Sequence, residues 1–214
     1  TSPEVEQLYI APGNGGSENY GINVPELSGK DFDAIADFIA SHGVNLLVSG
    51  PEEPLVQGIA DYFAERKEDF PHLMVVGPNA QGAQLEGSKD FSKAFMQRYG
   101  IPTASYRTFS ANEKSEAVAY LQTLHPPFVL KADGLAAGKG VLIVPTLEEA
   151  AKGFDDLAEG IWGSKGQKIV IEEFLQGIEC SIFVATDGLN YKVLPAAKDY
   201  KRIGDGDMGP NTGG

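Results

Sequence analysis

The chain has few cysteines and histidines, the residues that form disulfides and serve as metal ligands or catalytic groups in many small proteins. Its 214 residues include one cysteine, Cys180, and three histidines. A lone cysteine excludes an intrachain disulfide and is typical of a protein in a reducing cytoplasm. His42, His72 and His125 lie at a helix end, before a strand and before two prolines, where we expect structural or solvent-exposed roles.

Positive charge is also scarce. The sequence has 17 Lys and Arg residues against 30 Asp and Glu, a formal net charge of −13. Such a surface repels a phosphate backbone, so we expect no nucleic-acid partner. No apolar run approaches the roughly 20 residues of a membrane span, and no signal peptide is visible, so we expect no membrane partner either. Because basic residues are few, we expect a local reason wherever Lys and Arg residues cluster in the sequence.

What remains is an ordinary globular composition, 42% hydrophobic and 22% charged. The length is enough for one large or two small domains with hydrophobic cores. The sequence starts at Thr1 without a methionine and stops at "GPNTGG", inside a loop-like stretch. We interpret it as a fragment.

The first part alternates strands and helices. Apolar strand candidates are "LYIA", "VNLLVSG" and "HLMVVGP", the last two interpreted as buried. Helical spacing runs from Phe32 to Gly43, from Leu55 to Phe63, and from a cap at Ser88 to Gly100. This order predicts a parallel sheet with helices on its faces. Ligands of such sheets meet the loops after the strands, here "APGNGG", "GPEEPL" and "GPNAQG".

After "GIPT" the pattern becomes α+β with antiparallel hairpins. A helix is expected over Glu113–Leu124, and strands over Phe128–Ala132 and Val141–Val144. A capping box at Thr146 and Glu149 opens another helix. Later strands are "KIVIEEF", "CSIFVAT" and "YKVLPA", with a hairpin turn at Asp187-Gly188.

The glycine-rich stretch "VLKADGLAAGKGVLIV" can be compared with known phosphate-binding motifs. Its glycine spacing does not fit a P-loop, and it lacks the hydroxyl after the lysine. A dinucleotide turn needs a strand that runs into a helix, whereas two strands flank this loop. The stretch therefore predicts a hairpin flap, able to close over a triphosphate with backbone amides and Lys139.

Two neighbouring features each leave two interpretations. Lys131 lies in an apolar strand, so its ammonium needs an anionic partner, either a bound phosphate or a carboxylate of the chain. The strand end at Glu172–Leu175, with Glu179 beyond it, offers backbone groups for adenine and a carboxylate for ribose. Taken by itself, this stretch is better interpreted as an ordinary acidic strand end.

"VLKADGLAAGKGV" followed by "VIEEFLQGIECS" resembles the nucleotide cleft of the ATP-grasp fold. A wider set extends the resemblance, over nearly the whole chain, to the glycinamide ribonucleotide synthetase (phosphoribosylamine–glycine ligase) family: "APGN", "GPEEPL", "GPNAQGAQLEGSKDFSKAFM", "GIPTASY" and "DYKRIGDGDMGPNTGG". It implies an α/β fold. Residues 1–100 would be a parallel-sheet, Rossmann-like pre-ATP-grasp domain without its first strand and glycine turn. Residues 101–214 would be an incomplete ATP-grasp α+β domain, with a nucleotide-binding lid at about 101–175 and the start of a second subdomain at 176–214.

The resemblance also implies site residues. For ATP, the lysines that bind the phosphates would be Lys89 and Lys131, and the flap would contain Gly134, Gly138, Lys139 and Gly140. The hinge that contacts adenine would be Glu172, Glu173, Phe174 and Leu175, and the carboxylate that binds the ribose would be Glu179. For the sugar-phosphate substrate they are Gly13, Asn14, Glu52, Pro54, Lys201, Arg202, Asp207, Asn211, Thr212 and Gly213. Tyr200 stands where many relatives have histidine, which we interpret as a tolerated variation.

The family's reaction would join glycine to 5-phosphoribosylamine in purine biosynthesis, through glycyl phosphate, with ATP and Mg2+ or Mn2+. Catalysis would rest on positioning and charge neutralisation, with no enzyme nucleophile. The magnesium ligands would follow Gly214, so we predict no metal residue here and no ligase activity of this chain alone. A monomer or weak homodimer is expected.

Two other functions stay open. Another ATP-grasp enzyme, such as a biotin-dependent carboxylase subunit or a formate-using ribonucleotide formyltransferase, would share the lysines and the flap. A non-catalytic nucleotide-binding domain would bind ATP without acyl-phosphate chemistry. Stimulation of ADP formation by glycine separates both from the glycine ligase.

Overall fold

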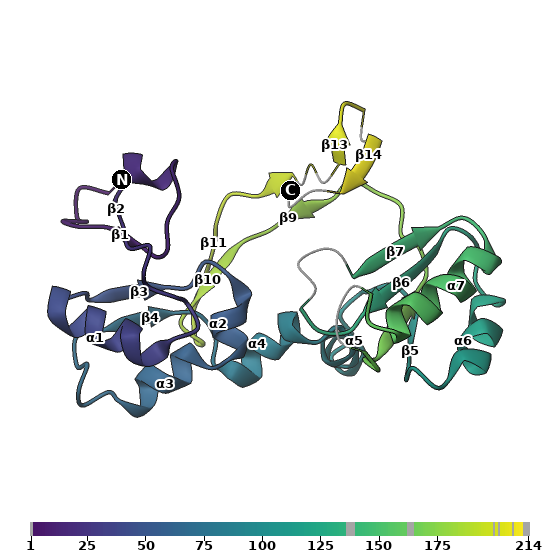
Figure 1. Cartoon of the computed structure of the whole chain (residues 1–214), viewed down its shortest axis with the longest axis horizontal. Helices are drawn as coiled ribbons and strands as arrows, with labels where there is room; N and C mark the ends of the chain where they lie inside the picture. The colour runs from purple at the N-terminus through teal and green to yellow at the C-terminus, as the bar shows by residue number, and fades with distance from the viewer. Residues whose placement is uncertain are drawn as a thin grey trace. The chain divides into compact units, whose positions relative to one another are not determined.

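The computed structural model describes residues 2–135, 140–161, 165–198, 200, 202–206 and 208–211. The chain divides into two compact units, Thr1–Gly87 and Ser88–Gly214, each with its own core (Figure 1). The sequence pattern changes after Gly100, but the division lies before α5 (Lys89–Arg98). This helix belongs to the second unit because its Lys93 binds residues of that unit.

The first unit contains two short pairs of parallel strands. β1 (Tyr9–Ile10) pairs with β2 (Ile22–Asn23), and β3 (Leu46–Val48) pairs with β4 (Met74–Val76). Around them lie the short 3-10 helix η1 (Ser17–Asn19) and the helices α1 (Phe32–His42), α2 (Glu52–Val56), α3 (Ile59–Glu65) and α4 (Ala80–Gly87). The predicted parallel pairing is confirmed.

The strands of the first unit are covered on one face within the described residues, and the prediction that β3 and β4 are fully buried was wrong. Leu47 and Val75 pack against a core formed mainly by α1 and α3, with Ile35, Ile39 and Phe63 at its centre. Their neighbours along the strands, Leu46, Val48, Met74 and Val76, are 45–63% exposed. Side chains alternate across a strand, so an apolar run alone does not reveal how many faces are covered.

Glycines set the helix boundaries of the first unit. Asp31 caps the start of α1, where its carboxylate accepts from the amide of Ala34. The helix ends at Gly43, which has a φ of 63°, and this end was predicted. The single helix expected over Leu55–Phe63 is instead two, because Gly58 takes a φ of 91° between α2 and α3. α4 occupies "AQGAQLEG", whose start was predicted to be loop.

The second unit is built on a four-stranded sheet in the order β5 (Tyr106–Phe109), β8 (Ile169–Glu172), β6 (Phe128–Ala132) and β7 (Val141–Val144). All neighbouring pairs are antiparallel. Besides α5, the described part of this unit has the helices α6 (Lys114–Leu121), shorter than predicted, and α7 (Leu147–Ala158). α7 begins with the predicted capping box, in which Thr146 Oγ1 accepts from the Glu149 amide at 3.2 Å.

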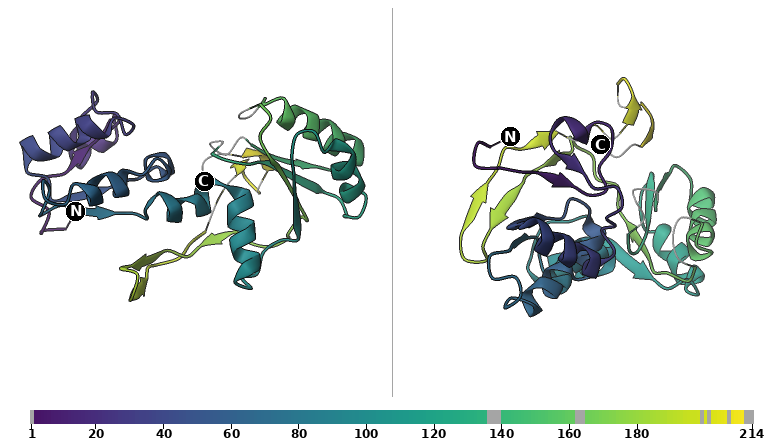
Figure 2. Two further views of the ribbon diagram at one scale, coloured as in Figure 1. Left: turned by 90° about the horizontal axis from the view of Figure 1, so that it is seen from below. Right: turned by 60° about the vertical axis from the view of Figure 1, so that its left-hand side comes forward.

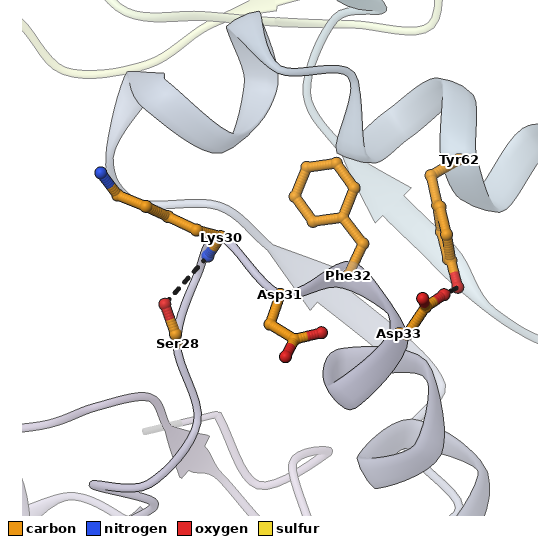
Figure 3. A pocket seen from close by; sticks show the side chains of 6 residues that line it. All are labelled: Ser28, Lys30, Asp31, Phe32, Asp33 and Tyr62. Carbon is orange, nitrogen blue, oxygen red and sulfur yellow. Dashed lines mark hydrogen bonds between the residues drawn. The ribbon is translucent and has the colours of Figure 1, made fainter.

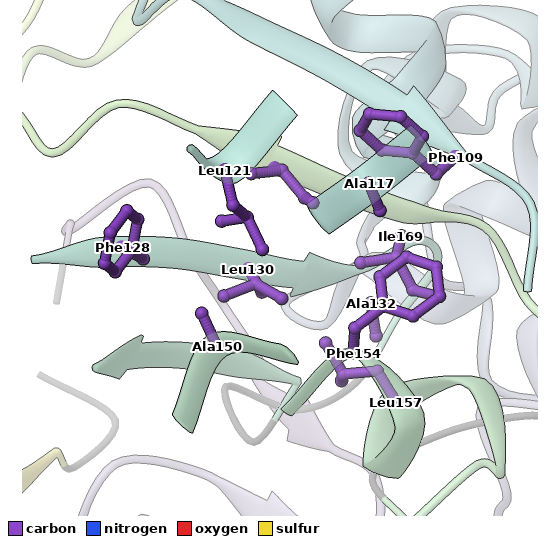
Figure 4. Packing of buried hydrophobic residues seen from close by; sticks show 11 residues of the cluster. Phe109, Ala117, Leu121, Phe128, Leu130, Ala132, Ala150, Phe154, Leu157 and Ile169 are labelled. Carbon is purple, nitrogen blue, oxygen red and sulfur yellow. The ribbon is translucent and has the colours of Figure 1, made fainter. Parts of the chain in front are cut away.

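One face of this sheet is apolar and covered by α6 and α7. Leu130, Ala132 and Ile169 of the sheet meet Leu121 of α6 and Phe154 of α7 in a fully buried cluster (Figure 4). We call it the apolar face. The opposite face carries the intervening residues of the same strands, which include Lys131 on β6 and Glu172 on β8. We call it the charged face.

The chain continues into three short antiparallel pairs (Figure 2). β9 (Cys180–Ser181) pairs with β12 (Ala197–Lys198), β10 (Val184–Thr186) with β11 (Tyr191–Val193), and β13 (Arg202–Gly204) with β14 (Met208–Asn211). The predicted Asp187-Gly188 turn joins β10 and β11. There, amides of Asn190 and Leu189 donate to the Asp187 carboxylate, which lowers its pKa to about 2. Among the described helices, none is long and apolar enough to cross a membrane.

Candidate functional site

The glycine-rich stretch lies where β6 turns into β7. The two strands pair from Phe128–Val144 to Lys131–Val141, and the Ala132 amide donates to the Gly140 carbonyl at 2.7 Å. Gly134 has a φ of 90°, a conformation that side chains rarely adopt. The predicted hairpin between two strands is confirmed. Gly138 and Lys139 lie outside the described residues.

Lys131 has a carboxylate partner within the chain. Its Nζ lies 2.6 Å from Glu172 Oε1, in an ion pair that lacks hydrogen-bond geometry. The register explains the contact, since Lys131 is opposite Val170 and Glu172 is opposite Val129, which places the two charged residues diagonally on one face. The lysine side chain is 29% exposed and the carboxylate 5%. The predicted need for an anion is met, at least in part, by Glu172.

Lys93 is a part of this site that the sequence analysis missed. It is buried in α5, and its Nζ donates to Glu172 Oε2 at 2.7 Å, to Thr103 Oγ1 at 2.8 Å and to the Ala104 carbonyl at 3.3 Å. Phe91, an apolar residue of the same helix, is 40% exposed. The available signal was the i, i+4 spacing of Lys89 and Lys93, which puts both lysines on one helical face.

The N-terminus of α5 is tied to the root of the β6–β7 hairpin. Ser88 caps the helix as predicted and donates from its Oγ to the Asp133 carboxylate at 3.1 Å. The amide of Asp90 donates to the same carboxylate at 3.2 Å, and Lys89 Nζ donates to the Gly134 carbonyl at 2.8 Å. The helix that carries Lys89 and the strand that carries Lys131 are therefore held together.

Asp90 forms a charged pair beside this junction. Its carboxylate accepts from Lys168 Nζ. Partial burial raises the pKa of Asp90, but interactions with Lys168 and Thr108 together outweigh burial, so the pKa lies below its ordinary value. In the same pair the hydrogen bond to Asp90 raises the pKa of Lys168.

The end of β8 is more engaged than the sequence suggested. The Glu173 amide, expected to be free, donates to the Ser105 carbonyl at 3.0 Å. The Glu173 carboxylate accepts hydrogen bonds from the amide and the hydroxyl of Ser105. The hydrogen bond from the amide is the largest of the effects that lower the pKa of Glu173. Phe174 and Leu175 follow with side chains 39% and 62% exposed. Glu179 lies further along, before β9.

The residues expected to meet the sugar phosphate in the first unit have local contacts. Asn14 Oδ1 accepts from the amides of Gly16 and Ser17, and its carbonyl accepts from Asn23. Gly13 allows this turn to close, since a Cβ there would lie 2.2 Å from Asn23 Oδ1. Glu52 lies in the first turn of α2 and Pro54 is buried in it. Among the described residues, the hydrogen bonds of Asn14 are made to Gly16, Ser17 and Asn23, near it in the chain.

The C-terminal substrate residues are only partly described. Arg202 and Asn211 are opposite each other in the backbone register of β13 and β14. The stretch expected to be a loop thus contains a β-hairpin, with Gly206 at a φ of 72° in its turn. Lys201, Asp207, Thr212 and Gly213 lie outside the described residues.

A hollow of about 660 Å3 lies in the first unit at the start of α1. Figure 3 shows that its polar groups are used within the fold: Tyr62 donates to Asp33 at 2.6 Å, and the Lys30 amide donates to Ser28 Oγ. Asp31 caps α1. These contacts leave the hollow without an evident ligand. In the part of the chain that the structure describes, no group of three His, Cys, Asp or Glu side chains could hold a metal ion.

Comparison with protein families gives two matches that follow one another along the chain. The model for the phosphoribosylglycinamide synthetase N domain matches residues 1–86, and the model for the ATP-grasp (A) domain of the same enzyme matches residues 87–214. Together they span the chain.

Individual relatives agree with these matches. The chain is 46% identical over 215 residues to a phosphoribosylamine–glycine ligase of Nostoc sp. and 47% identical over 220 residues to one of Ralstonia nicotianae. It is covered completely in both comparisons, but it spans about half the length of these relatives, 49% in each case.

Solved structures show the same relationship. A crystal structure of phosphoribosylamine–glycine ligase from Thermotoga maritima superposes with a TM-score of 0.73 at 35% identity, over 96% of this chain and 47% of that one. The biotin carboxylase domain of a Hydrogenobacter thermophilus 2-oxoglutarate carboxylase, solved with MgADP, ADP and bicarbonate, gives a TM-score of 0.58 at 22% identity, over 80% of this chain and 37% of that one. The second likeness concerns the fold alone.

Proposed function

The chain belongs to the phosphoribosylglycinamide synthetase family, and from that premise we propose that its protein joins glycine to 5-phosphoribosylamine with ATP. One observation carries the proposal: the N domain and the ATP-grasp domain of a single enzyme family match the chain in order and from end to end. The products would be glycinamide ribonucleotide, ADP and phosphate, a step of purine biosynthesis. A cytoplasmic location and a monomer or weak homodimer belong to the same proposal.

In the proposed ATP site, lysines from two elements bind the phosphates. Lys131 keeps 29% of its side chain exposed beside the hairpin root, and Lys89 is fixed next to it through Gly134. Gly134 to Gly140, with Gly138 and Lys139, would form the flap over the triphosphate. The proximity of two ammonium groups to a glycine-rich hairpin supports this assignment.

The nucleoside would lie at the end of β8. The assigned hinge is Glu172 to Leu175, and Glu179 is assigned to the ribose hydroxyls. Because Ser105 already accepts from the Glu173 amide, the backbone groups of Phe174 and Leu175 are the better candidates for the adenine edge. Residues 101–175 would then act as the lid and residues 176–214 would begin the second subdomain.

The proposed chemistry needs positioning more than a reactive side chain. A glycine carboxylate oxygen would attack the γ-phosphorus of ATP, release ADP and form glycyl phosphate. The amine of 5-phosphoribosylamine would then attack the acyl carbon, lose a proton and displace phosphate. Lysines at the phosphates would neutralise the charge that accumulates during phosphoryl transfer.

Mg2+ or Mn2+ would neutralise further phosphate charge. The described residues offer no group of three ligands for such an ion, so no step is assigned to it here. Gly13, Asn14, Glu52, Pro54 and the residues assigned between Lys201 and Gly213 would contact the sugar-phosphate substrate.

Turnover of the full-length protein tests this function. We expect ADP release that requires both glycine and 5-phosphoribosylamine. ADP release that ignores glycine would favour another ATP-grasp enzyme, and ATP binding without turnover would favour a nucleotide-binding domain.

The Lys131→Ala variant tests the site. It should lose activity and bind ATP more weakly, because one phosphate-binding charge is gone. Unchanged ATP affinity would contradict the assignment. Lys165→Ala, an exposed lysine paired with Glu159, is the matched control.

A further inference from the structure

Three charges meet on the charged face of the sheet. Lys93 and Glu172 are the charged residues among the buried side chains of the described chain, with 8% and 5% of their side chains exposed. Lys131 completes the cluster and is the member that reaches solvent. Two ammonium groups share one carboxylate, so the cluster carries one excess positive charge.

The other contacts of Lys93 do not balance this excess. Thr103 Oγ1 and the Ala104 carbonyl are neutral acceptors, and the Tyr106 ring lies 5.5 Å from the ammonium. The Glu173 carboxylate is close enough for Lys93 to contribute to its lowered pKa, but it is partly exposed to solvent and bound to Ser105. Charge in water is screened far more strongly than charge in the interior.

The position of Lys93 suggests what the excess is for. If Glu172 faced Lys131 alone, the two would form a neutral pair, and the lysine would offer little net charge to a ligand. Lys93 engages the other carboxylate oxygen from the buried side. The Glu172 carboxylate, neutralised by Lys93, holds Lys131 in place, while the net positive charge of the cluster stays at the exposed ammonium of Lys131.

We propose that Lys93 sets the charge of the ATP site: by neutralising Glu172 from within the fold, it leaves the ammonium of Lys131 available to the phosphates. This inference rests on the proposed ATP binding. Lys93 does not touch the nucleotide in this arrangement and acts through Glu172 as a positioning residue.

The first test removes the buried charge. In the full-length protein, Lys93→Met makes the cluster neutral, and the ATP dissociation constant should rise about ten-fold by isothermal titration calorimetry. Adenosine, which has no phosphate, should bind as before. Lys114→Met is the matched control, because it removes an exposed lysine, paired with Asp155, from the same unit. It should change ATP affinity less than about two-fold.

The second test restores the balance by another route. Lys93→Met combined with Glu172→Gln again leaves one excess positive charge, and ATP affinity should return to within about three-fold of the unaltered protein. Glu172→Gln alone adds positive charge, so its affinity for ATP relative to its affinity for adenosine should not fall below that of the unaltered protein; the adenosine measurement accounts for any effect on the hinge. A purely structural role of Lys93 predicts no such rescue.

Several outcomes would overturn the inference. They are an unchanged ATP affinity of Lys93→Met, an equal weakening of ATP and adenosine, and a double variant as weak as the single one. If circular dichroism shows that Lys93→Met does not fold, Glu172→Gln decides, and a loss of ATP affinity that exceeds its loss of adenosine affinity refutes the idea. An unaltered protein that binds no ATP would refute the proposed function itself, which keeps the two failures distinct.

Discussion

The two faces of the four-stranded sheet use the same strands for opposite purposes. On β6, Leu130 and Ala132 point to the apolar face, whereas Lys131 lies on the charged face between them. On β8, Ile169 and Ile171 are fully buried against the helices, and Glu172 turns to the other side. The apolar face is closed by α6 and α7, and the charged face receives Lys93 from α5.

This difference separates stability from binding within one sheet. Apolar burial stabilises a fold without direction, roughly in proportion to the area removed from water. Buried charges contribute little net stability, because desolvation offsets their attraction. We therefore expect changes on the apolar face to alter unfolding and changes on the charged face to alter ligand affinity.

The largest effect on stability should follow from Phe154→Ala. Phe154 of α7 is fully buried against the apolar face, and its loss should lower the free energy of unfolding by about 3–5 kcal/mol. Denaturant unfolding would measure it. Ile143→Ala is the control, since Ile143 lies on β7 with 42% of its side chain exposed and should cost about 1 kcal/mol or less. Equal losses in the two variants would contradict the contrast.

A smaller effect is expected from Asp133→Ala, which cuts the tie between α5 and the hairpin root. The carboxylate accepts from Ser88 Oγ and from the Asp90 amide, so its removal should cost about 1–2 kcal/mol in chemical unfolding. Asp133→Asn keeps an acceptor and should lose less. Glu116→Ala, an exposed acid on α6, is the matched control. A loss of unfolding free energy no larger than that of the control would show that the contacts of Asp133 with Ser88 and Asp90 do not stabilise the fold.

The smallest effect concerns pH. Lys168→Ala should raise the pKa of Asp90, because the ammonium that lowers it is gone. The folded-state pKa is depressed, so the pair stabilises the fold above the unfolded value of about 3.9 and ceases to do so as pH falls through the folded pKa. NMR titration of the Asp90 carboxyl measures the shift. Lys165→Ala should leave it in place, and a similar change in both variants would argue against the pairing.

Local signals in the sequence predicted much of the fold. Gly43, Ser88 and the capping box at Thr146 marked helix ends because each acts through its own backbone neighbours. The hairpin that joins β6 and β7 followed from the two apolar runs around the glycines. Such features depend on a few adjacent residues.

What the sequence could not predict depends on distant partners. The one-sided burial of β3 and β4 depends on where the helices pack. Lys93 is separated from Glu172 by 79 residues, and its spacing from Lys89 indicates a shared helical face but not burial. Site residues were therefore predicted at Lys89, Lys131 and the end of β8, where motifs are continuous, and Lys93 was missed.

The diagonal of Lys131 and Glu172 also bears on how the sheet avoids misassembly. A slip of one residue in β6 would exchange its two faces and drive an ammonium into the space now filled by Leu121 and Phe154. A similar slip in β8 would bury its carboxylate there. Long apolar strands alone tolerate several alignments, but these two charges make the wrong ones costly. The residues proposed to hold a ligand in the finished protein would then also select the correct strand alignment while it folds.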